Sequence, residues 1–305
     1  MRRASLVAWV CLFIVWVVWG STYLAIRVAV ETIPPLLMAA ARQLVAGMIM
    51  FPLAVRSRRA AARAGQVARR WPGRAEWLGC AIVGVLLLVA NGAVGIGEQT
   101  VPSGLAALLV ATVPLWLLGF DAVLNHARLG LAPVAGLALG LVGVGFLSGL
   151  GGDSGQISAV GVVIILAAAA MWALGTIMTR RVTIPSSPAL ASGMELLCGG
   201  VALLALAAAA GEFGSLHLVG VSWRSWLALG YLIVAGSIVA FSAYGIAVRA
   251  LPTATVATYA YVNPVIAVLL GTLILGERLT PAMFGGGALI VGAVVLVVRR
   301  SPPAH

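Results

Sequence analysis

The sequence has very little charge for its length. Charged residues make up 9% of its 305 residues, hydrophobic residues make up 62%, and the mean hydropathy is +1.11. A soluble domain of this size carries roughly 25% charged residues, so this chain lacks the groups that would cover a water-facing surface. The composition excludes a soluble globular protein and indicates an integral membrane protein, with the lipid bilayer as its solvent.

Residues that build catalytic and metal sites are also scarce. The three cysteines lie in apolar runs, and neither they nor the three histidines show a metal-ligand spacing. The sequence contains no Walker loop, no GxSxG elbow and no aspartate-rich diphosphate motif. We therefore expect no catalytic residues, no metal and no cofactor. Any transport would be driven by a substrate or ion gradient.

Long apolar runs predict an all-α protein with ten transmembrane helices. A spanning helix needs about 20 apolar residues, and the alternating pattern of a membrane barrel is absent. Proline, glycine and arginine separate the runs into spans at 6–27, 35–55, 76–97, 103–124, 131–150, 157–179, 188–210, 225–248, 253–275 and 281–298.

The basic residues predict the orientation of these spans. All 19 are arginine, and seven lie between Arg56 and Arg74. With the amino terminus in the cytoplasm, 15 arginines fall on the cytoplasmic side and three on the outer side, which is a strong positive-inside asymmetry. We expect a multi-pass protein of the plasma (inner) membrane with both termini cytoplasmic. The net charge of +11 does not indicate a nucleic-acid partner, because no aromatic platform or recognition helix accompanies it.

Two halves of the chain repeat each other. Trp19 matches Trp172 at an offset of 153 residues, and Pro114 matches Pro264 at an offset of 150. We therefore predict two five-helix repeats, residues 1–150 and 151–305. Because five is odd, the repeats must have opposite orientations in the membrane. Inverted repeats are the physical basis of alternating access, with a site between the halves near the midplane.

At these residues the sequence resembles the EamA family of the drug/metabolite transporter superfamily. The resemblance covers essentially the whole chain and includes Trp19–Thr22, Trp172–Gly175, Ala250–Ala254, Asn263–Pro264 and Gly276–Leu279. It implies ten helices, cytoplasmic termini and export of amino acids or other small metabolites. One departure is Ala127, which replaces the acid of the Gly-Glu-Arg-Leu-like turn in the first half.

The expected function is that of a secondary transporter exporting a small-molecule metabolite, such as an amino acid, by alternating access. Helices one, three, four, six, eight and nine would line its cavity. Alternatives are an exporter of lipophilic drugs or cations, a non-transporting membrane scaffold and a membrane-embedded enzyme. Substrate, coupling ion and oligomeric state stay open at this point.

Polar and aromatic groups at membrane depth are the candidate substrate-binding residues, because they are costly unless they face the protein interior or a water-filled cavity. They are Trp19, Asn91, Trp172, Tyr244, Tyr259 and Asn263. For the two tryptophans the alternative is the interface belt. For Asn263 the alternative is a hydrogen bond to the carbonyl that Pro264 leaves free.

Two further groups carry candidate roles in gating and coupling. Pro114 and Pro264 are candidate hinges, or alternatively static kinks that shape packing. Arg42 and Glu195 occupy equivalent repeat positions with opposite charge. This arrangement fits an ion pair or proton coupling through Glu195; alternatively, each side chain snorkels to the membrane surface or pairs locally. Glu98 is a third candidate for coupling, at the mouth of the pathway or in solvent.

Overall fold

The protein was analysed as a computed structural model that describes residues 2–63, 71–124, 135–136, 138–140, 142–143, 158–251, 256 and 258–300. Regular structure within these ranges is entirely helical. The first half contributes α1 (Arg2–Ala29), α2 (Pro35–Arg63), α3 (Arg74–Gly97), α4 (Ser103–Val110) and α5 (Val113–Leu124). The second half contributes α7 (Ala159–Met178), α8 (Pro188–Ala209), α10 (Trp223–Tyr231), α11 (Ala240–Ala250), α13 (Tyr259–Leu275) and α14 (Pro281–Arg300).

The all-helical membrane architecture is confirmed. Seven segments of the described chain are long and apolar enough to cross a membrane, and two shorter apolar helices, Val262–Leu275 and Met283–Ala293, follow them. These segments correspond to nine of the ten predicted spans. The predicted span 131–150 lies mostly outside the described residues, so the count of ten helices stays a prediction.

Helix α2 is longer than the predicted span 35–55, because it continues to Arg63. The segment beyond residue 55 is rich in arginine and alanine, which are strong helix formers. Long arginine side chains can also place their charges in water at the end of a span. The guanidinium of Arg59 lies over the ring of Trp71, with Cζ 4.9 Å from the ring centroid. Part of the basic cluster is therefore a helix end and not a loop.

Two predicted spans are interrupted helices. Span 103–124 consists of α4 and α5, which are separated by a turn at Ala111–Thr112. Span 225–248 consists of α10, the π-helix η2 (Leu232–Val239) and α11. The loop predicted at 211–225 contains two short elements, α9 (Glu212–Ser215) and the 3-10 turn η1 (Leu218–Gly220). π-Helical segments are rare and occur often at functional sites.

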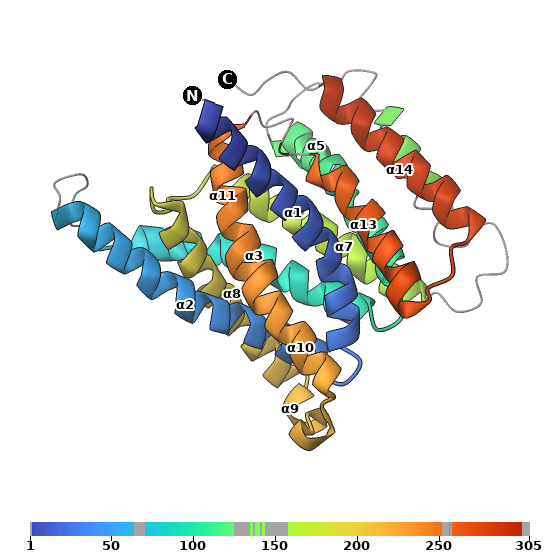
Figure 1. The fold of residues 1–305 in the computed structure, drawn as a ribbon, viewed down its shortest axis with the longest axis horizontal. Coiled ribbons are helices and arrows are strands. Elements are labelled where there is room, and N and C mark those ends of the chain that lie inside the picture. Colours follow the sequence, from blue (N-terminus) through green and yellow to red (C-terminus); the bar gives the residue numbers. More distant parts are fainter. Residues whose placement is uncertain are drawn as a thin grey trace.

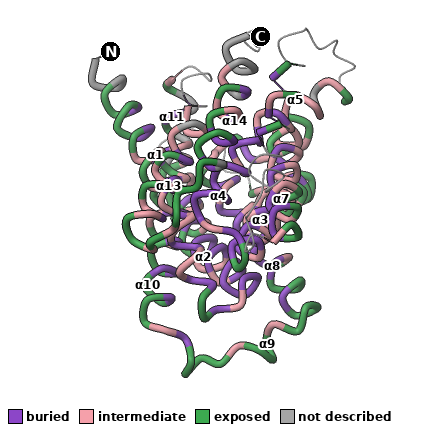
Figure 2. The backbone as a smooth tube through the Cα atoms, turned by 90° about the vertical axis from the view of Figure 1, so that its right-hand side faces the viewer, coloured by how far each residue is buried: buried purple, intermediate pink, exposed green. Residues whose placement is uncertain are grey.

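Helices of the two halves pack into one bundle. Helix α1 lies between α11 and α13, α2 packs along α8, and α3 packs along both α7 and α8 (Figure 1). Buried positions lie mainly inside this bundle, whereas its flanks and the α9 end are mostly exposed (Figure 2). Large apolar side chains on the flanks, such as Leu273 and Val160, are exposed, as expected for a surface that faces lipid.

The contact between α2 and α8 is reciprocal. A Cβ atom added at Gly47 would lie 3.0 Å from Leu197 Cγ, and one added at Gly200 would lie 2.8 Å from Leu44 Cγ. Both the glycines and the leucines are related by the offset of 153 residues found in the sequence. Small residues let helix backbones approach closely in a membrane, so equivalent positions of the two halves meet at this contact.

Candidate functional site: a central cavity between the two halves

A cavity of about 390 Å³ lies between the helices of the two halves. This central cavity is lined by α1, α2, α3, α4, α5, α7, α11 and α13 and by the turn between α4 and α5. Its polar and aromatic lining residues are Trp19, Thr22, Tyr23, Arg42, Asn91, Trp172, Phe241, Tyr259 and Asn263. Ligand sites in proteins commonly have volumes of about 300–1,000 Å³, so the central cavity is large enough for a small metabolite.

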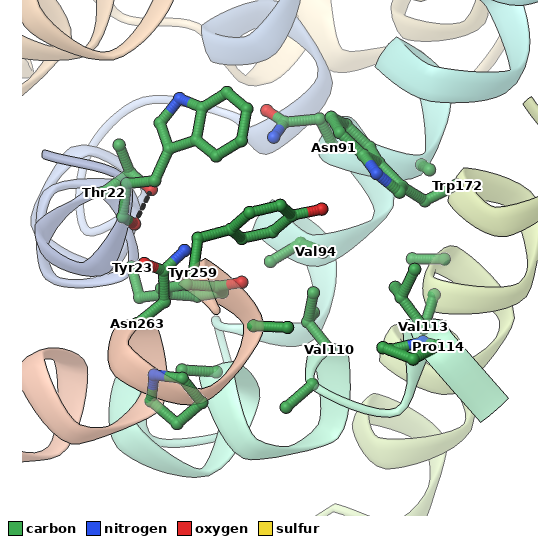
Figure 3. Close-up of a pocket in the computed structure, with 18 of the residues that line it drawn as sticks. Thr22, Tyr23, Asn91, Val94, Val110, Val113, Pro114, Trp172, Tyr259 and Asn263 are labelled. Atoms are coloured by element: carbon green, nitrogen blue, oxygen red, sulfur yellow. Dashed lines mark hydrogen bonds between the residues drawn. The ribbon is translucent and has the colours of Figure 1, made fainter. Parts of the chain in front are cut away.

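The lining residues approach the central cavity from opposite sides. Thr22, Tyr23 and Tyr259 lie on one side, and Trp172 and Pro114 lie on the other (Figure 3). The six helices expected to line it, the first, third, fourth, sixth, eighth and ninth, all contribute. The second helix contributes as well, through Arg42.

Aromatic rings surround Trp19 on one wall. The centroid of its ring lies 5.1 Å from that of Tyr244, 5.4 Å from that of Tyr259 and 5.6 Å from that of Phe241. The indole Nε1 of Trp19 donates to the carbonyl of Gly236 in η2, at 3.3 Å. Trp19 is thus held by α11, α13 and η2 in the wall of the central cavity. Its repeat equivalent, Trp172, also lines the central cavity.

The candidate residue Tyr244 takes a different place. It is absent from the lining of the central cavity and packs behind it, against Trp19 and Tyr259. Phe241, one turn earlier on α11, lines the central cavity instead. The sequence did not single out Phe241, since a lone phenylalanine in an apolar helix carries no signal in one sequence.

The guanidinium of Arg42 is held by two neutral acceptors. Its Nε donates to Ser237 Oγ at 2.9 Å, and Nη1 donates to Asn91 Oδ1 at 3.1 Å. The ion pair considered for Arg42 and Glu195 is not formed between these described side chains. Glu195 lies on the face of α8 that packs against Gly84 of α3, and it does not line the central cavity.

Asn263 connects α13 to α1. In the amide orientation assigned from its neighbours, Nδ2 donates to the carbonyls of Trp16 and Tyr259, both at 3.1 Å. The alternative partner was the backbone carbonyl that Pro264 leaves without a donor. In an α-helix that carbonyl belongs to Ala260, and Asn263 bonds to other carbonyls instead. Its amide serves contact between helices while the residue also lines the central cavity.

The two prolines are both at the central cavity but in different local structures. Pro264 lies inside the continuous helix α13, whereas Pro114 is the second residue of α5. Proline is well tolerated in the first turn of a helix, where its missing N–H has no helical partner. Pro114 therefore marks a helix break, and of the pair Pro264 alone lies in the interior of a described helix.

Glu98 lies apart from the central cavity, at the end of α3, and is not in solvent. It is 0% exposed, and within the part of the chain that the structure describes neither of its carboxylate oxygens has a hydrogen-bond partner. Arg27 of α1 donates to its backbone carbonyl. Burial raises the pKa of the Glu98 carboxyl well above its usual range; the nearby charge of Glu277 raises it further, and Arg27 opposes the shift.

Comparison with known proteins identifies a family that matches most of the chain. The model of the EamA-like transporter family matches residues 7–149 and, a second time, residues 159–299. A solved crystal structure is similar over 97% of this chain and 96% of that chain, with a TM-score of 0.60 and 22% identity. That likeness supports the fold alone.

Several named relatives are transporters. The "uncharacterized inner membrane transporter YedA" of Escherichia coli (strain K12) is 40% identical over 94% of this chain and 89% of its own length. A "probable terminal-alkyne amino-acid exporter" of Streptantibioticus cattleyicolor is 30% identical over 93% of this chain and 91% of its own. A "probable amino-acid metabolite efflux pump" of Escherichia coli (strain K12) is 25% identical over 92% and 91%.

Proposed function

Since this chain belongs to the EamA-like transporter family, we propose that it is a secondary transporter that exports a small amphipathic metabolite, such as an amino acid, by alternating access. The observation that carries the proposal is the central cavity, which lies between the halves and is lined by residues of both. Two relatives are named as amino-acid exporters or efflux pumps, which supports export and an amino-acid substrate.

In this proposal, alternating access relies on an inverted repeat. Helices α1 and α7 correspond in the two halves, as do α3 and the segment α10–α11. Under this correspondence, the contact of α1 with α11 is equivalent to the contact of α7 with α3. The reciprocal pair of Gly47 with Leu197 and Gly200 with Leu44 supports the same two-fold relation. Two halves related in this way can exchange conformations, which opens the site to each side of the membrane in turn.

The proposed orientation places the amino terminus and the basic end of α2 in the cytoplasm. The carboxyl end of α11 packs against the amino-terminal half of α1, and α10 packs against its other half. The segment around α9 lies at the opposite end of the bundle from the start of α1 (Figure 2). Export in this orientation carries substrate toward the α9 end.

We propose Glu98 as the proton-coupling group of this transporter, in preference to Glu195. Glu98 is buried, and its two carboxylate oxygens have no partner among the described residues. It lies near Tyr23, which lines the central cavity. The charged groups around it are Arg27 of α1 and Glu277 of the segment between α13 and α14. A carboxyl in this setting can take up and release a proton as its surroundings change between the two access states.

The direct test is flux through the purified full-length chain in liposomes. Vesicles are loaded with a panel of labelled amino acids, and efflux is followed with and without an imposed pH gradient. We expect efflux of at least one amino acid, and we expect Glu98→Gln to abolish its dependence on the gradient while downhill efflux persists. An absence of substrate-dependent flux across a wide panel would refute the transporter proposal.

Export of a lipophilic drug or cation is the second candidate, and the aromatic rings around Trp19 favour it. Aromatic faces attract cations at separations below about 6 Å. The same vesicles loaded with a lipophilic cation separate the two candidates. Faster efflux of the cation than of any amino acid would support the alternative. A scaffold or an embedded enzyme would show no flux of either compound.

A further inference from the structure

Arg42 is a buried cation without a described anionic partner. The side chain is 3% exposed, yet both of its hydrogen-bond acceptors are neutral oxygens. A guanidinium has five N–H donors, so one donor on Nη1 and both on Nη2 have no protein acceptor among the described residues. Burying a charge in this way is costly unless an anion pairs with it. The local environment of Arg42 is therefore incomplete without an anion.

The guanidinium is held in a fixed orientation by three elements. Asn91 on α3 and Ser237 on η2 each accept one of its hydrogen bonds, and Ser237 in turn donates to Gln43 on α2 at 3.4 Å. The absence of a side chain at Gly236 leaves room for the group, because a Cβ there would lie 3.1 Å from Nη2. A charged donor fixed in this way loses little conformational freedom when it binds a ligand.

The remainder of the central cavity is mainly apolar. Its lining includes Val110 of α4, Leu117 and Leu118 of α5, and Ala168 and Ala169 of α7. None of these side chains can bind a charged or hydrogen-bonding group. A ligand that fits both parts has one anionic group and a mainly apolar remainder of limited size. An ammonium group on such a ligand can donate to the hydroxyl oxygens of Thr22, Tyr23 or Tyr259, which also line the central cavity.

We propose that Arg42 binds the carboxylate of the substrate, and that the substrate is an amphipathic monocarboxylate, such as an amino acid with an apolar side chain. The apolar part lies against α4, α5 and α7. A guanidinium pairs with carboxylate or phosphate in a bidentate manner. Arg42 is the one cationic side chain that lines the central cavity within the described residues, and a single positive charge matches a carboxylate better than a doubly charged phosphate monoester. The same charge disfavours lipophilic cations.

This inference rests on the proposed transport function, so its test measures binding and flux separately. Binding of phenylalanine, phenylalanine amide, phenethylamine and phenyl phosphate is measured from the shift in melting temperature of the purified full-length chain in detergent. Flux of the same compounds is measured in liposomes. We expect phenylalanine to bind about tenfold or more tightly than its amide, which is the effect of one lost charge-assisted hydrogen bond.

Variants then assign the preference to Arg42. In Arg42→Gln the preference for the acid over the amide disappears, and in Arg42→Lys it is reduced but present. Asn91→Ala, which removes one acceptor of the guanidinium, weakens phenylalanine binding less than Arg42→Gln does. Arg224→Gln, at an exposed position of α10 outside the central cavity, is the matched control for loss of a guanidinium, and it keeps the wild-type ratio of acid to amide. Elution as a single monodisperse species shows that each variant is folded.

Each outcome separates the two proposals. An equal affinity of the wild type for acid and amide, tighter binding of phenyl phosphate, or an acid preference that survives in Arg42→Gln would overturn the role of Arg42. Flux of phenethylamine without that of phenylalanine would also overturn it and leave a transporter of cations. Binding of phenylalanine without flux of any compound would overturn the transport function and keep the carboxylate site.

Discussion

At the scale of single residues, the acids of this chain differ in what they contact. Glu76, Glu212 and Glu277 each accept hydrogen bonds from backbone N–H groups. The carboxylate oxygens of Glu98 are buried and accept no hydrogen bond from any residue that the structure describes. The difference arises from place, because the first three lie beside the free N–H groups at the start of a helix. Glu98 follows the end of α3, where carbonyl groups are exposed instead.

The first prediction concerns stability and the pKa of Glu98. A free glutamate has a pKa of about 4.3, and burial holds the pKa of Glu98 well above that value. Between the two values the native state holds a proton that the unfolded state has released, so stability falls as pH rises. The stability of Glu98→Gln does not fall in this way, because the amide stays neutral.

Melting temperatures of both proteins in detergent, measured from about pH 5 to about pH 9, test this point. We expect the melting temperature of the wild type to fall relative to that of Glu98→Gln across this range. Parallel curves for the two proteins would contradict the prediction. Glu31→Gln, at an exposed position between α1 and α2, is the control for loss of a carboxylate.

At the scale of elements, two helices are capped by carboxylates from distant parts of the chain. Glu212 accepts from the N–H groups of Leu36 and Leu37 at the start of α2, at 3.2 and 2.8 Å. Glu277 accepts from those of Ser103 and Gly104 at the start of α4, at 2.8 and 3.2 Å. The acid of the Gly276–Leu279 turn therefore has a structural role, which the sequence alone did not reveal.

The second prediction is that Glu277→Ala destabilises the protein by about 1 kcal/mol, the usual cost of a lost helix cap. Removal of the negative charge at the positive end of the α4 dipole acts in the same direction. Chemical unfolding in mixed micelles measures the change. Glu31→Ala should stay within about 0.5 kcal/mol of the wild type. A similar loss in both variants would show that the cap contributes nothing specific.

The sequence predicted which helices exist and in which order they follow, but not where a helix is interrupted. The positions of α1, α3, α7 and α8 agree with the predicted spans to within a few residues, because continuous apolar runs bounded by polar or proline residues define them. The break before Pro114 and the π-helix η2 were not predicted. The π-helix makes a contact with another helix that the sequence alone does not show, the hydrogen bond from Trp19 to the carbonyl of Gly236. The break falls where Pro114 lacks the N–H that would continue the helix.

At the scale of the whole molecule, the contact of α2 with α8 tests the inverted repeat. Gly47 and Gly200 are equivalent positions, and a Cβ on either would approach the partner leucine at 3.0 Å or less. The third prediction is that Gly47→Ala and Gly200→Ala destabilise the protein by similar amounts, about 1–3 kcal/mol each, through overpacking. Chemical unfolding in micelles provides the comparison.

Gly119→Ala is the matched control for this pair. Gly119 lies in α5, and an added Cβ would meet nothing within 4 Å. Alanine favours a helix over glycine, so this variant should be neutral or slightly stabilising. Very unequal effects of the two substitutions at the α2–α8 contact would argue against a two-fold axis there.

The fourth prediction concerns orientation in the membrane. Replacement of Arg56, Arg58, Arg59 and Arg63 by glutamine removes four positive charges at the end of α2. Orientation follows the distribution of basic residues, so a fraction of molecules should insert with the opposite topology. Fluorescent-protein and phosphatase fusions at the carboxyl terminus report the side of the membrane. A fully retained wild-type topology would show that other charges determine orientation.

The sequence by itself determined that this is a helical membrane protein, that its helices lie near the observed positions, and that its halves repeat. These properties follow from composition, run length and spacing, which are local or additive along the chain. Only the tertiary structure decided which side chains share the central cavity, since the bundle brings Arg42 of α2, Asn91 of α3 and Trp172 of α7 together in its lining. It also decided that Arg42 and Glu195 do not pair and that Glu98 is buried, because burial depends on packing between distant segments.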